Sequence, residues 1–163
     1  LGHYGKLFLN RVFSFSPYVV DKSHRKKITD YDWRLKDAEW NFFNFEQSKG
    51  NVVLINFWAS WHLPSRAQFQ EIEKLYERYN GQIDFYLISD EEREPVEEFL
   101  RKNKYDLPIT YQIIGEPSPI KLLKPPGCYV IDKQGFIRIH QTDISDWTNE
   151  KVNVFLEELL AEE

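Results

Sequence analysis

A chain of 163 residues is the size of one domain, and a hydrophobic content of 42% with 16% aromatic residues is enough for a packed core and excludes a disordered chain. The net charge of −5 comes from 21 basic and 26 acidic residues that are interspersed along the sequence. Such a distribution builds no strong positive field for phosphates, so we expect one compact domain that does not bind nucleic acid.

The cysteine content excludes an internal disulfide, because Cys128 is the single cysteine of the chain. The sequence contains no apolar run long enough to span a bilayer. It begins at Leu1 and has no methionine, so we expect an upstream initiation region, where a signal peptide or a membrane anchor would fit.

Residues 1–27 differ in character from the rest and are predicted to be an N-terminal extension of a domain over residues 28–163. Apolar residues such as Leu7–Leu9 alternate with charged ones, and a basic cluster follows at Lys22–Lys27. Two interpretations stay open. The extension is either an amphipathic juxtamembrane segment with its basic residues near lipid, or a segment whose aromatic side chains pack on the domain.

From Ile28 onward the pattern becomes that of β-strands. Alternation over Asp32–Leu35, a turn at Asp37–Glu39 and renewed alternation over Trp40–Phe45 predict a β-hairpin. The continuous β-rich run Val52–Phe57 is typical of a strand buried in the middle of a sheet. We therefore expect the central strand there.

Helices and strands alternate in the next part of the chain. Apolar residues at helical spacing predict a helix that ends at Asn80–Gly81, and Pro95 lies near the start of a second predicted helix. Strands are predicted over Gln82–Ser89 and Ile109–Ile114. This β-α-β-α-β order predicts parallel strands in the core of the sheet.

The C-terminal part supplies a second hairpin and a closing helix. Strands are predicted over Gly127–Asp132 and Phe136–Gln141, joined by a turn at Lys133–Gly135. A helix is predicted over Asn149–Leu160, and Pro117–Leu123 is either a loop or a short helix. The chain is thus predicted to be an α/β protein with a central mixed β-sheet flanked by helices and an N-terminal β-hairpin.

The most informative stretch follows the predicted central strand. Phe57-Trp58-Ala59-Ser60-Trp61 leads into His62-Leu63-Pro64-Ser65 and then into an amphipathic helix. This layout resembles the redox site of the TlpA/ResA branch of the thioredoxin-like thiol-disulfide oxidoreductases, whose motif is FWASWCxPCRxE. By that resemblance, His62 and Ser65 occupy the two cysteine positions, and Gln68 occupies the position of the family's glutamate.

A second segment carries the same resemblance. Pro125–Asp132 is similar to the family's PTTFLID strand, which makes Pro126 the counterpart of its cis-proline. In the family, that proline exposes backbone beside the redox pair, so that an extended substrate hydrogen-bonds like an added strand. The resemblance covers Trp33–Leu160 and implies a thioredoxin-like fold.

The resemblance also implies that dithiol chemistry is absent from this chain. In the family, one cysteine attacks a substrate disulfide as a thiolate, the second resolves the mixed disulfide, and the glutamate serves proton transfer. Histidine and serine cannot perform this exchange, and an amide cannot take up or release a proton. We therefore expect no dithiol redox activity and no cofactor.

Other chemistry at these positions has less support. A hydrolase pair of His62 and Ser65 would need an acidic partner and a nucleophile elbow, and the sequence shows neither. A metal site would need His3, His24, His62 and His140 to converge, and no spacing suggests that they do. We therefore expect no metal ligands.

Cys128 is the alternative redox group. It follows the proline on a strand near the predicted redox helix, where a lone thiol would act as a monothiol partner or be oxidised reversibly. The competing interpretation is a small apolar filler of a buried strand. Of the two tryptophans in the motif, Trp58 is expected to be buried and Trp61 exposed.

The leading hypothesis is a redox-inactive, thioredoxin-like module that binds an extended polypeptide or a partner protein. The residues expected to line its groove are Trp61, His62, Leu63, Pro64, Pro125 and Pro126. The alternative hypothesis is an atypical monothiol oxidoreductase that acts through Cys128. By resemblance, either protein would work in the cell envelope on the periplasmic side, with an anchor upstream of the given chain.

Overall fold

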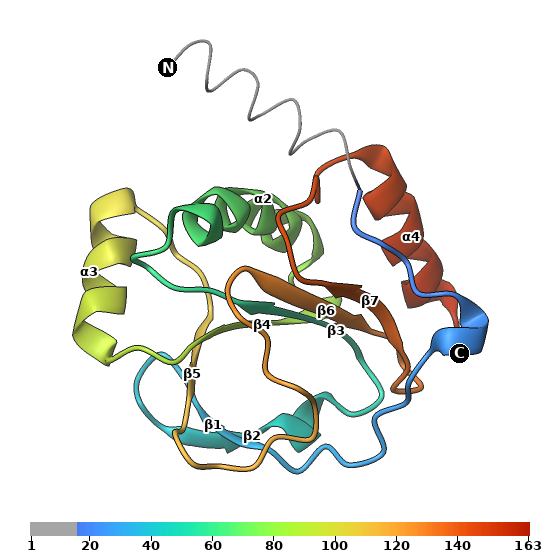
Figure 1. Cartoon of the computed structure of the whole chain (residues 1–163), viewed down its shortest axis with the longest axis horizontal. Coiled ribbons are helices and arrows are strands. Elements are labelled where there is room, and N and C mark those ends of the chain that lie inside the picture. Colours follow the sequence, from blue (N-terminus) through green and yellow to red (C-terminus); the bar gives the residue numbers. More distant parts are fainter. Residues whose placement is uncertain (1–15) are drawn as a thin grey trace.

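The computed structural model describes residues 16–163, and the strands of this part of the chain form one mixed sheet (Figure 1). In chain order, the strands are β1 (Arg34–Lys36), β2 (Phe42–Asn44), β3 (Val52–Phe57), β4 (Ile83–Ser89), β5 (Ile109–Gln112), β6 (Gly127–Ile131) and β7 (Ile137–Gln141). They lie side by side in the order β2-β1-β5-β4-β3-β6-β7. The predicted α/β class and the two predicted hairpins are confirmed.

Strand β3 forms the buried middle of the sheet, because every residue from Val52 to Phe57 is buried. It pairs in parallel with β4 and antiparallel with β6, and β4 pairs in parallel with β5. Apolar side chains at successive positions suit a strand that is covered on both faces. The predictions of the central strand and of a parallel core are confirmed.

Three helices cover one face of the sheet, as Figure 1 shows. They are α2 (Leu63–Tyr79), α3 (Arg93–Asn103) and α4 (Glu150–Ala161). Their apolar side chains join those of Val52 and Leu54 in one buried cluster. Within residues 16–163, none of the helices is long and apolar enough to cross a bilayer.

The opposite face of the sheet is covered by loops, by the hairpin β1–β2 and by the 3-10 helix η2 (Phe45–Ser48). Val53 and Ile55 of β3 point to this side, where they pack with Trp33 and Phe45. The alternation of β3 side chains between two separate clusters is what a pleated strand imposes.

The first hairpin differs from the prediction at its turn. Trp40 was expected to begin a strand, but it lies in the turn with φ of 73°, a left-handed conformation that ends the extended backbone. Its amide donates to the carbonyl of Asp37, 2.9 Å away. The second strand therefore starts at Phe42 rather than at Trp40, and it ends at Asn44 because Phe45 enters η2.

One further boundary differs from the prediction, and one alternative is decided. Strand β5 ends at Gln112 rather than at Ile114, whose side chain is 74% exposed and has no sheet partner in the described part of the chain. Residues 117–123 form a loop, which decides between the loop and the short helix that the sequence left open.

The described part of the N-terminal extension runs along the outer edge of β7. The amide of Val20 donates to Arg138, that of Ile137 to Lys26, and that of Ile28 to Gly135, each at 2.8 Å. Between these contacts, the chain forms the 3-10 turn η1 (Lys22–His24). The predicted amphipathic stretch before residue 16 lies outside the described residues, so the two interpretations of it stay predictions.

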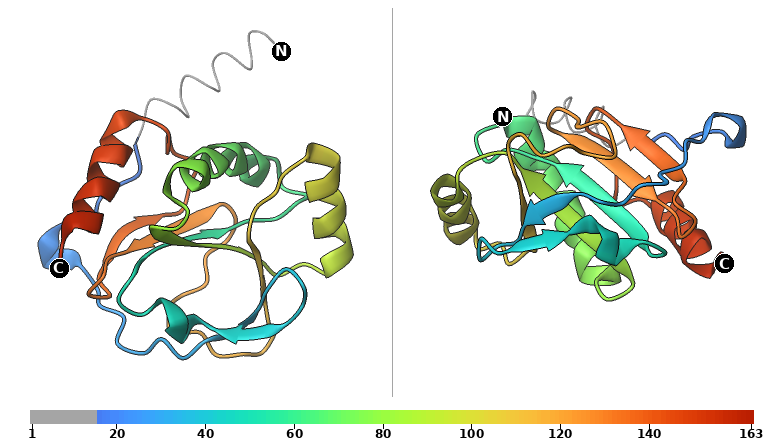
Figure 2. Two further views of the ribbon diagram at one scale, coloured as in Figure 1. Left: turned by 180° about the vertical axis from the view of Figure 1, so that it is seen from behind. Right: turned by 90° about the horizontal axis from the view of Figure 1, so that it is seen from below.

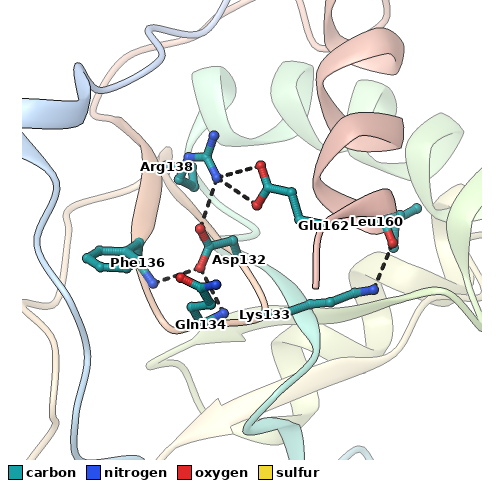
Figure 3. Close-up of polar contacts among 7 residues, drawn as sticks. All are labelled: Asp132, Lys133, Gln134, Phe136, Arg138, Leu160 and Glu162. Atoms are coloured by element: carbon teal, nitrogen blue, oxygen red, sulfur yellow. Dashed lines mark hydrogen bonds and ion pairs between the residues drawn. The ribbon is translucent and has the colours of Figure 1, made fainter.

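An ion-pair network fixes the end of α4 to the turn between β6 and β7 (Figure 3). The guanidinium of Arg138 donates through Nη1 to Asp132 at 2.9 Å and to both carboxylate oxygens of Glu162 at 3.0 and 3.1 Å. The second oxygen of Asp132 accepts from the amides of Gln134 and Phe136. Because Asp132 and Arg138 are both buried, the pair fixes the orientation of the hairpin.

Candidate functional site

The loop between β3 and α2 separates its two tryptophans as the sequence predicted. Trp58 is buried, and its indole Nε1 donates to the carbonyl of Leu87 at 3.2 Å. Trp61 is 70% exposed, and Leu63, at the first position of α2, is 71% exposed. The start of the helix thus presents two large apolar side chains to solvent.

His62 and Ser65 contact each other at the start of α2. The Nδ1 atom of His62 lies 3.0 Å from the hydroxyl oxygen of Ser65, which is fully buried. Within residues 16–163, Ser65 is the hydrogen-bond partner of this imidazole and no carboxylate approaches it. A hydrolase pair would lack the acid that orients its histidine, so the geometry does not support that interpretation.

A carboxylate fixes the loop that carries Trp61. Glu91 accepts hydrogen bonds from the amide and the hydroxyl of Ser60, at 2.8 and 2.6 Å. It also accepts from the hydroxyl of Ser89 at 2.8 Å, at the end of β4. Three donors on one carboxylate hold the loop against the neighbouring strand.

Replacing Glu91 by alanine is expected to reduce the free energy of unfolding by about 2 kcal/mol, because the buried Ser89 hydroxyl and the Ser60 amide would lose their acceptor. Urea denaturation measures this change. The matched control is Glu92→Ala at the exposed neighbouring position, whose side chain makes no capping hydrogen bond. Equal stability of the two variants would show that Glu91 does not hold the loop.

Two residues on the inner face of α2 fasten the segment between β7 and α4. The amide side chain of Gln68 donates to the carbonyl of Ser145 at 3.1 Å and accepts from the amide of Ser145 at 3.0 Å. One turn further along α2, Glu71 Oε1 accepts from the amide of Trp147 at 2.6 Å. At the position that the resemblance assigns to the family's glutamate, this chain thus has Gln68, whose side chain is hydrogen-bonded to the backbone of Ser145.

The carboxyl group of Glu71 is buried, and its second oxygen has no hydrogen-bond partner within the described residues. Burial is the main reason that its pKa is raised to about 7, and the negative charge of Asp146 raises it further. The hydrogen bond from Trp147 and the positive charge of Lys74 act in the opposite direction. Glu71 therefore changes charge near neutral pH in the interior of the domain.

Cys128 lies in the interior of β6 and is fully buried. Burial raises the pKa of its thiol to about 12, although the side-chain amide of Asn56 donates to the sulfur at 3.3 Å and lowers it in part. A thiol with this pKa is almost entirely protonated at neutral pH and is a weak nucleophile. The position thus fits the apolar filler better than the monothiol.

Pro125 and Pro126 precede β6 and lie beside the end of β3, because Gly127 pairs with Phe57. The peptide bond between the two prolines is cis. Pro126 is buried and Pro125 is half-buried. Gly127 cannot be replaced without a shift of the chain, because a Cβ atom there would overlap the Cβ of Leu123.

The structure places the predicted groove residues on two adjacent segments. Trp61, His62, Leu63 and Pro64 form the first turn of α2 and the residues before it, and the proline pair precedes the strand that flanks β3. Within residues 16–163, no three His, Cys, Asp or Glu side chains form a group that could hold a metal ion. His3, the remaining member of the proposed histidine set, lies outside the described residues.

A hollow of about 740 Å³ lies at the other end of the parallel strands and contains none of the predicted site residues. The residues that begin β4 and β5, Ile83 and Ile109, contribute to its wall. It is therefore separate from the candidate site.

Two functional-site residues were missed by the sequence analysis. Glu71 lies between Phe69 and Ile72 on a predicted amphipathic helix, and an acid close to the apolar face was a signal of burial. Glu91 carried no such signal, because its partner Ser60 lies 31 residues earlier in the chain.

Comparison with known proteins identifies the family of this chain. The sequence model of the AhpC/TSA family matches residues 26–140. The chain belongs to the AhpC/TSA family. The predicted resemblance to the thioredoxin-like thiol-disulfide oxidoreductases is thereby confirmed, and so is the thioredoxin-like fold.

Individual relatives and solved structures agree with this assignment. The chain is 29% identical to the thioredoxin-like protein YneN of Bacillus subtilis over 66% of its own length. The matched part is 65% of YneN, slightly less than two thirds of that relative. It is 26% identical to the thiol-disulfide oxidoreductase ResA of Bacillus cereus, over 77% of this chain and 73% of ResA. A secreted thiol-disulfide isomerase from Corynebacterium glutamicum has the same fold, with a TM-score of 0.65, 18% identity and coverage of 89% and 92% of the two chains.

Proposed function

We propose that this domain is a redox-inactive binding module of the thioredoxin fold, which holds an extended polypeptide at the site where its relatives exchange disulfides. One observation carries the proposal. Trp61 in the loop before α2 and Leu63 at the start of the helix are exposed, while His62 and Ser65 are hydrogen-bonded to each other and offer no thiol.

The lack of redox chemistry follows from the residues at this turn. Thiol-disulfide exchange needs a thiolate, and the start of α2 carries an imidazole and a hydroxyl instead. The neutral amide of Gln68 is hydrogen-bonded to the backbone of Ser145. Because an amide does not titrate, Gln68 cannot transfer protons as the family's glutamate does. We therefore infer that His62 and Ser65 occupy the positions of the family's cysteine pair, so that the fold is retained but thiol-disulfide exchange is lost.

The binding role rests on the shape and rigidity of the same region. Trp61 offers a large exposed aromatic surface of the kind that often dominates the energy of a protein interface. Glu91 holds the loop that carries it, so little order has to be gained when a polypeptide binds. The backbone before β6, at Pro125 and Pro126, would offer carbonyl oxygens alone to the amide groups of an extended chain, because a proline has no N–H to donate.

Monothiol chemistry at Cys128 is the competing proposal. The burial of this thiol and its raised pKa both oppose it. For location, we propose the extracytoplasmic side of the cell envelope, with support from the secreted thiol-disulfide isomerase that shares the fold.

The first experiment measures reduction of insulin disulfides by the purified protein, by the Cys128→Ala variant and by the double variant His62→Cys/Ser65→Cys. We expect no activity in the unmodified protein and measurable activity in the double variant, because the frame around α2 is intact. Activity in the unmodified protein that disappears in Cys128→Ala would establish the monothiol enzyme and overturn the proposal.

The second experiment measures binding of carboxymethylated insulin B chain, an extended polypeptide without free thiols, by isothermal titration. Trp61→Ala is expected to weaken binding by about 30-fold, as for a central aromatic anchor. Phe42→Ala is the control, because Phe42 is 58% exposed on β2 and lies outside the groove. Absence of binding, or equal affinities of the two variants, would contradict a groove at Trp61.

A further inference from the structure

The 3-10 turn η1 and the residues after it carry four cations, Lys22, Arg25, Lys26 and Lys27, which we call the basic turn. The three lysines are exposed and Arg25 is half-buried, and no residue of η1 is buried. Within residues 16–163, none of the four lies within 4.0 Å of a carboxylate oxygen. The charge of the basic turn is therefore available to a partner.

The surroundings of the basic turn add positive charge on one side and negative charge on the other. The positive charges of Lys121 and Lys26, after burial, lower the pKa of the nearby His140, so a fifth cation lies in the same region. Asp21 lies 4.0 Å from His24, and Glu162 and Glu163 line a hollow together with Lys22 and Arg25. Glu162 is itself paired with Arg138, so it does not neutralise the turn.

Exposed apolar residues lie directly before the basic turn. Tyr18 is 59% exposed and Val19 is 40% exposed, although Val19 forms a bridge with Ile139 of β7. An aromatic side chain beside several lysines is typical of segments that lie at the interface between a bilayer and water.

The position of the basic turn suits contact with an extended surface. The right view of Figure 2 shows η1 projecting beyond the edge of the sheet. In Figure 1 it lies at the opposite end of the molecule from the start of α2. A partner on the basic turn would therefore leave Trp61 and its neighbours accessible.

We propose that the basic turn and Tyr18 dock this domain on an anionic phospholipid surface. Each lysine or arginine near such a surface adds to the attraction, so the three lysines and Arg25 together give reversible binding that salt weakens. Tyr18 adds apolar contact at the level of the headgroups.

A membrane fits these features better than a nucleic acid does. The chain as a whole has a net charge of −5, so a long polyanion that follows the surface would meet repulsion beyond the turn. A bilayer contacts one end of the domain alone and can accept the apolar side chains of Tyr18 and Val19. The proposal is independent of the groove at Trp61 and is tested without it.

The experiment measures sedimentation of the full chain with phosphatidylcholine vesicles that contain 30% phosphatidylglycerol, beside vesicles of phosphatidylcholine alone. We expect partitioning to the anionic vesicles that is lost at high salt. The variant Lys22→Gln/Lys26→Gln/Lys27→Gln is expected to partition about 100-fold more weakly, which corresponds to three lysines at the surface. The control Arg101→Gln/Lys102→Gln/Lys104→Gln removes the same charge from exposed positions at the end of α3 and is expected to partition as the unmodified protein does.

The possible outcomes separate the alternatives. No partitioning of the unmodified chain, or equal losses in the two triple variants, would overturn the proposal. Binding of a single-stranded DNA oligonucleotide as tight as that of the anionic vesicles would also overturn it, because the turn would then recognise any polyanion. The Tyr18→Ala variant should lose part of the vesicle binding and none of its salt dependence.

Discussion

The domain is expected to become less stable as the pH rises from about 4.5 to about 7, and replacing Glu71 by glutamine is expected to prevent most of this loss. The pKa of Glu71 is about 7 in the folded protein, against an ordinary value of 4.5. The folded state thus holds this proton more tightly than the unfolded state. The stability that the proton contributes is fully present below pH 4.5 and is lost as the pH rises through 7.

The size of the effect follows from the shift in pKa. A difference of this size corresponds to about 3 kcal/mol between the two ends of the pH range, which is a large part of the stability of a small domain. The measurement is urea denaturation of the unmodified protein and of Glu71→Gln at several pH values from 4 to 8. The difference between the two free energies of unfolding should grow by about 3 kcal/mol over that range in favour of the variant.

The matched control is Glu77→Gln, because Glu77 lies on the same helix and is exposed. It removes the same charge, so its stability should follow the unmodified protein at every pH. Parallel curves for the unmodified protein and Glu71→Gln would show that Glu71 is ionised in the folded state as easily as in the unfolded one.

The thiol of Cys128 is expected to react with a disulfide reagent about 1000-fold more slowly in the folded protein than in urea at neutral pH. Its pKa is raised from 9.0 to about 12, which reduces the thiolate fraction by that factor, and burial blocks access in addition. The release of thionitrobenzoate from Ellman's reagent measures both rates.

The control for this experiment is the His62→Cys variant in a Cys128→Ala background. Position 62 is half-buried at the start of α2, where free amide groups favour a thiolate, so this thiol should react rapidly in the folded protein. A native Cys128 that reacts within about tenfold of its unfolded rate would restore the monothiol enzyme as the better explanation of function.

The sequence predicted the parts of the fold that depend on local pattern. Val52–Phe57 is apolar at every position except Asn56, and the helix after it keeps its apolar spacing as far as the stop at Asn80, so both elements follow from the local pattern. The exposure of Trp61 and the burial of Trp58 followed from the resemblance of the motif. The left-handed conformation of Trp40 was not predictable, because tryptophan has no preference for that region of backbone space.

The polar contacts that shape the candidate site were beyond sequence reasoning, because they join distant parts of the chain. Glu71 meets Trp147, 76 residues later, and Gln68 meets Ser145, 77 residues later. A periodicity argument places such side chains on a helix face but does not supply their partners. The burial that raises the pKa of Glu71 is a property of the assembled layers, so it became visible with the fold.

Gln68 and Glu71 hold the segment before α4 by two sets of hydrogen bonds, of which the first is independent of pH and the second depends on it. The two hydrogen bonds between Gln68 and Ser145 are the same in acid and in base, because the amide does not titrate. Ionisation of Glu71 strengthens the hydrogen bond from Trp147, but it places a negative charge in the interior, and this burial is unfavourable. Alkaline conditions should therefore favour local opening beside Glu71 that lets water reach the carboxylate, while the contact between Gln68 and Ser145 and the first turn of α2 stay in place.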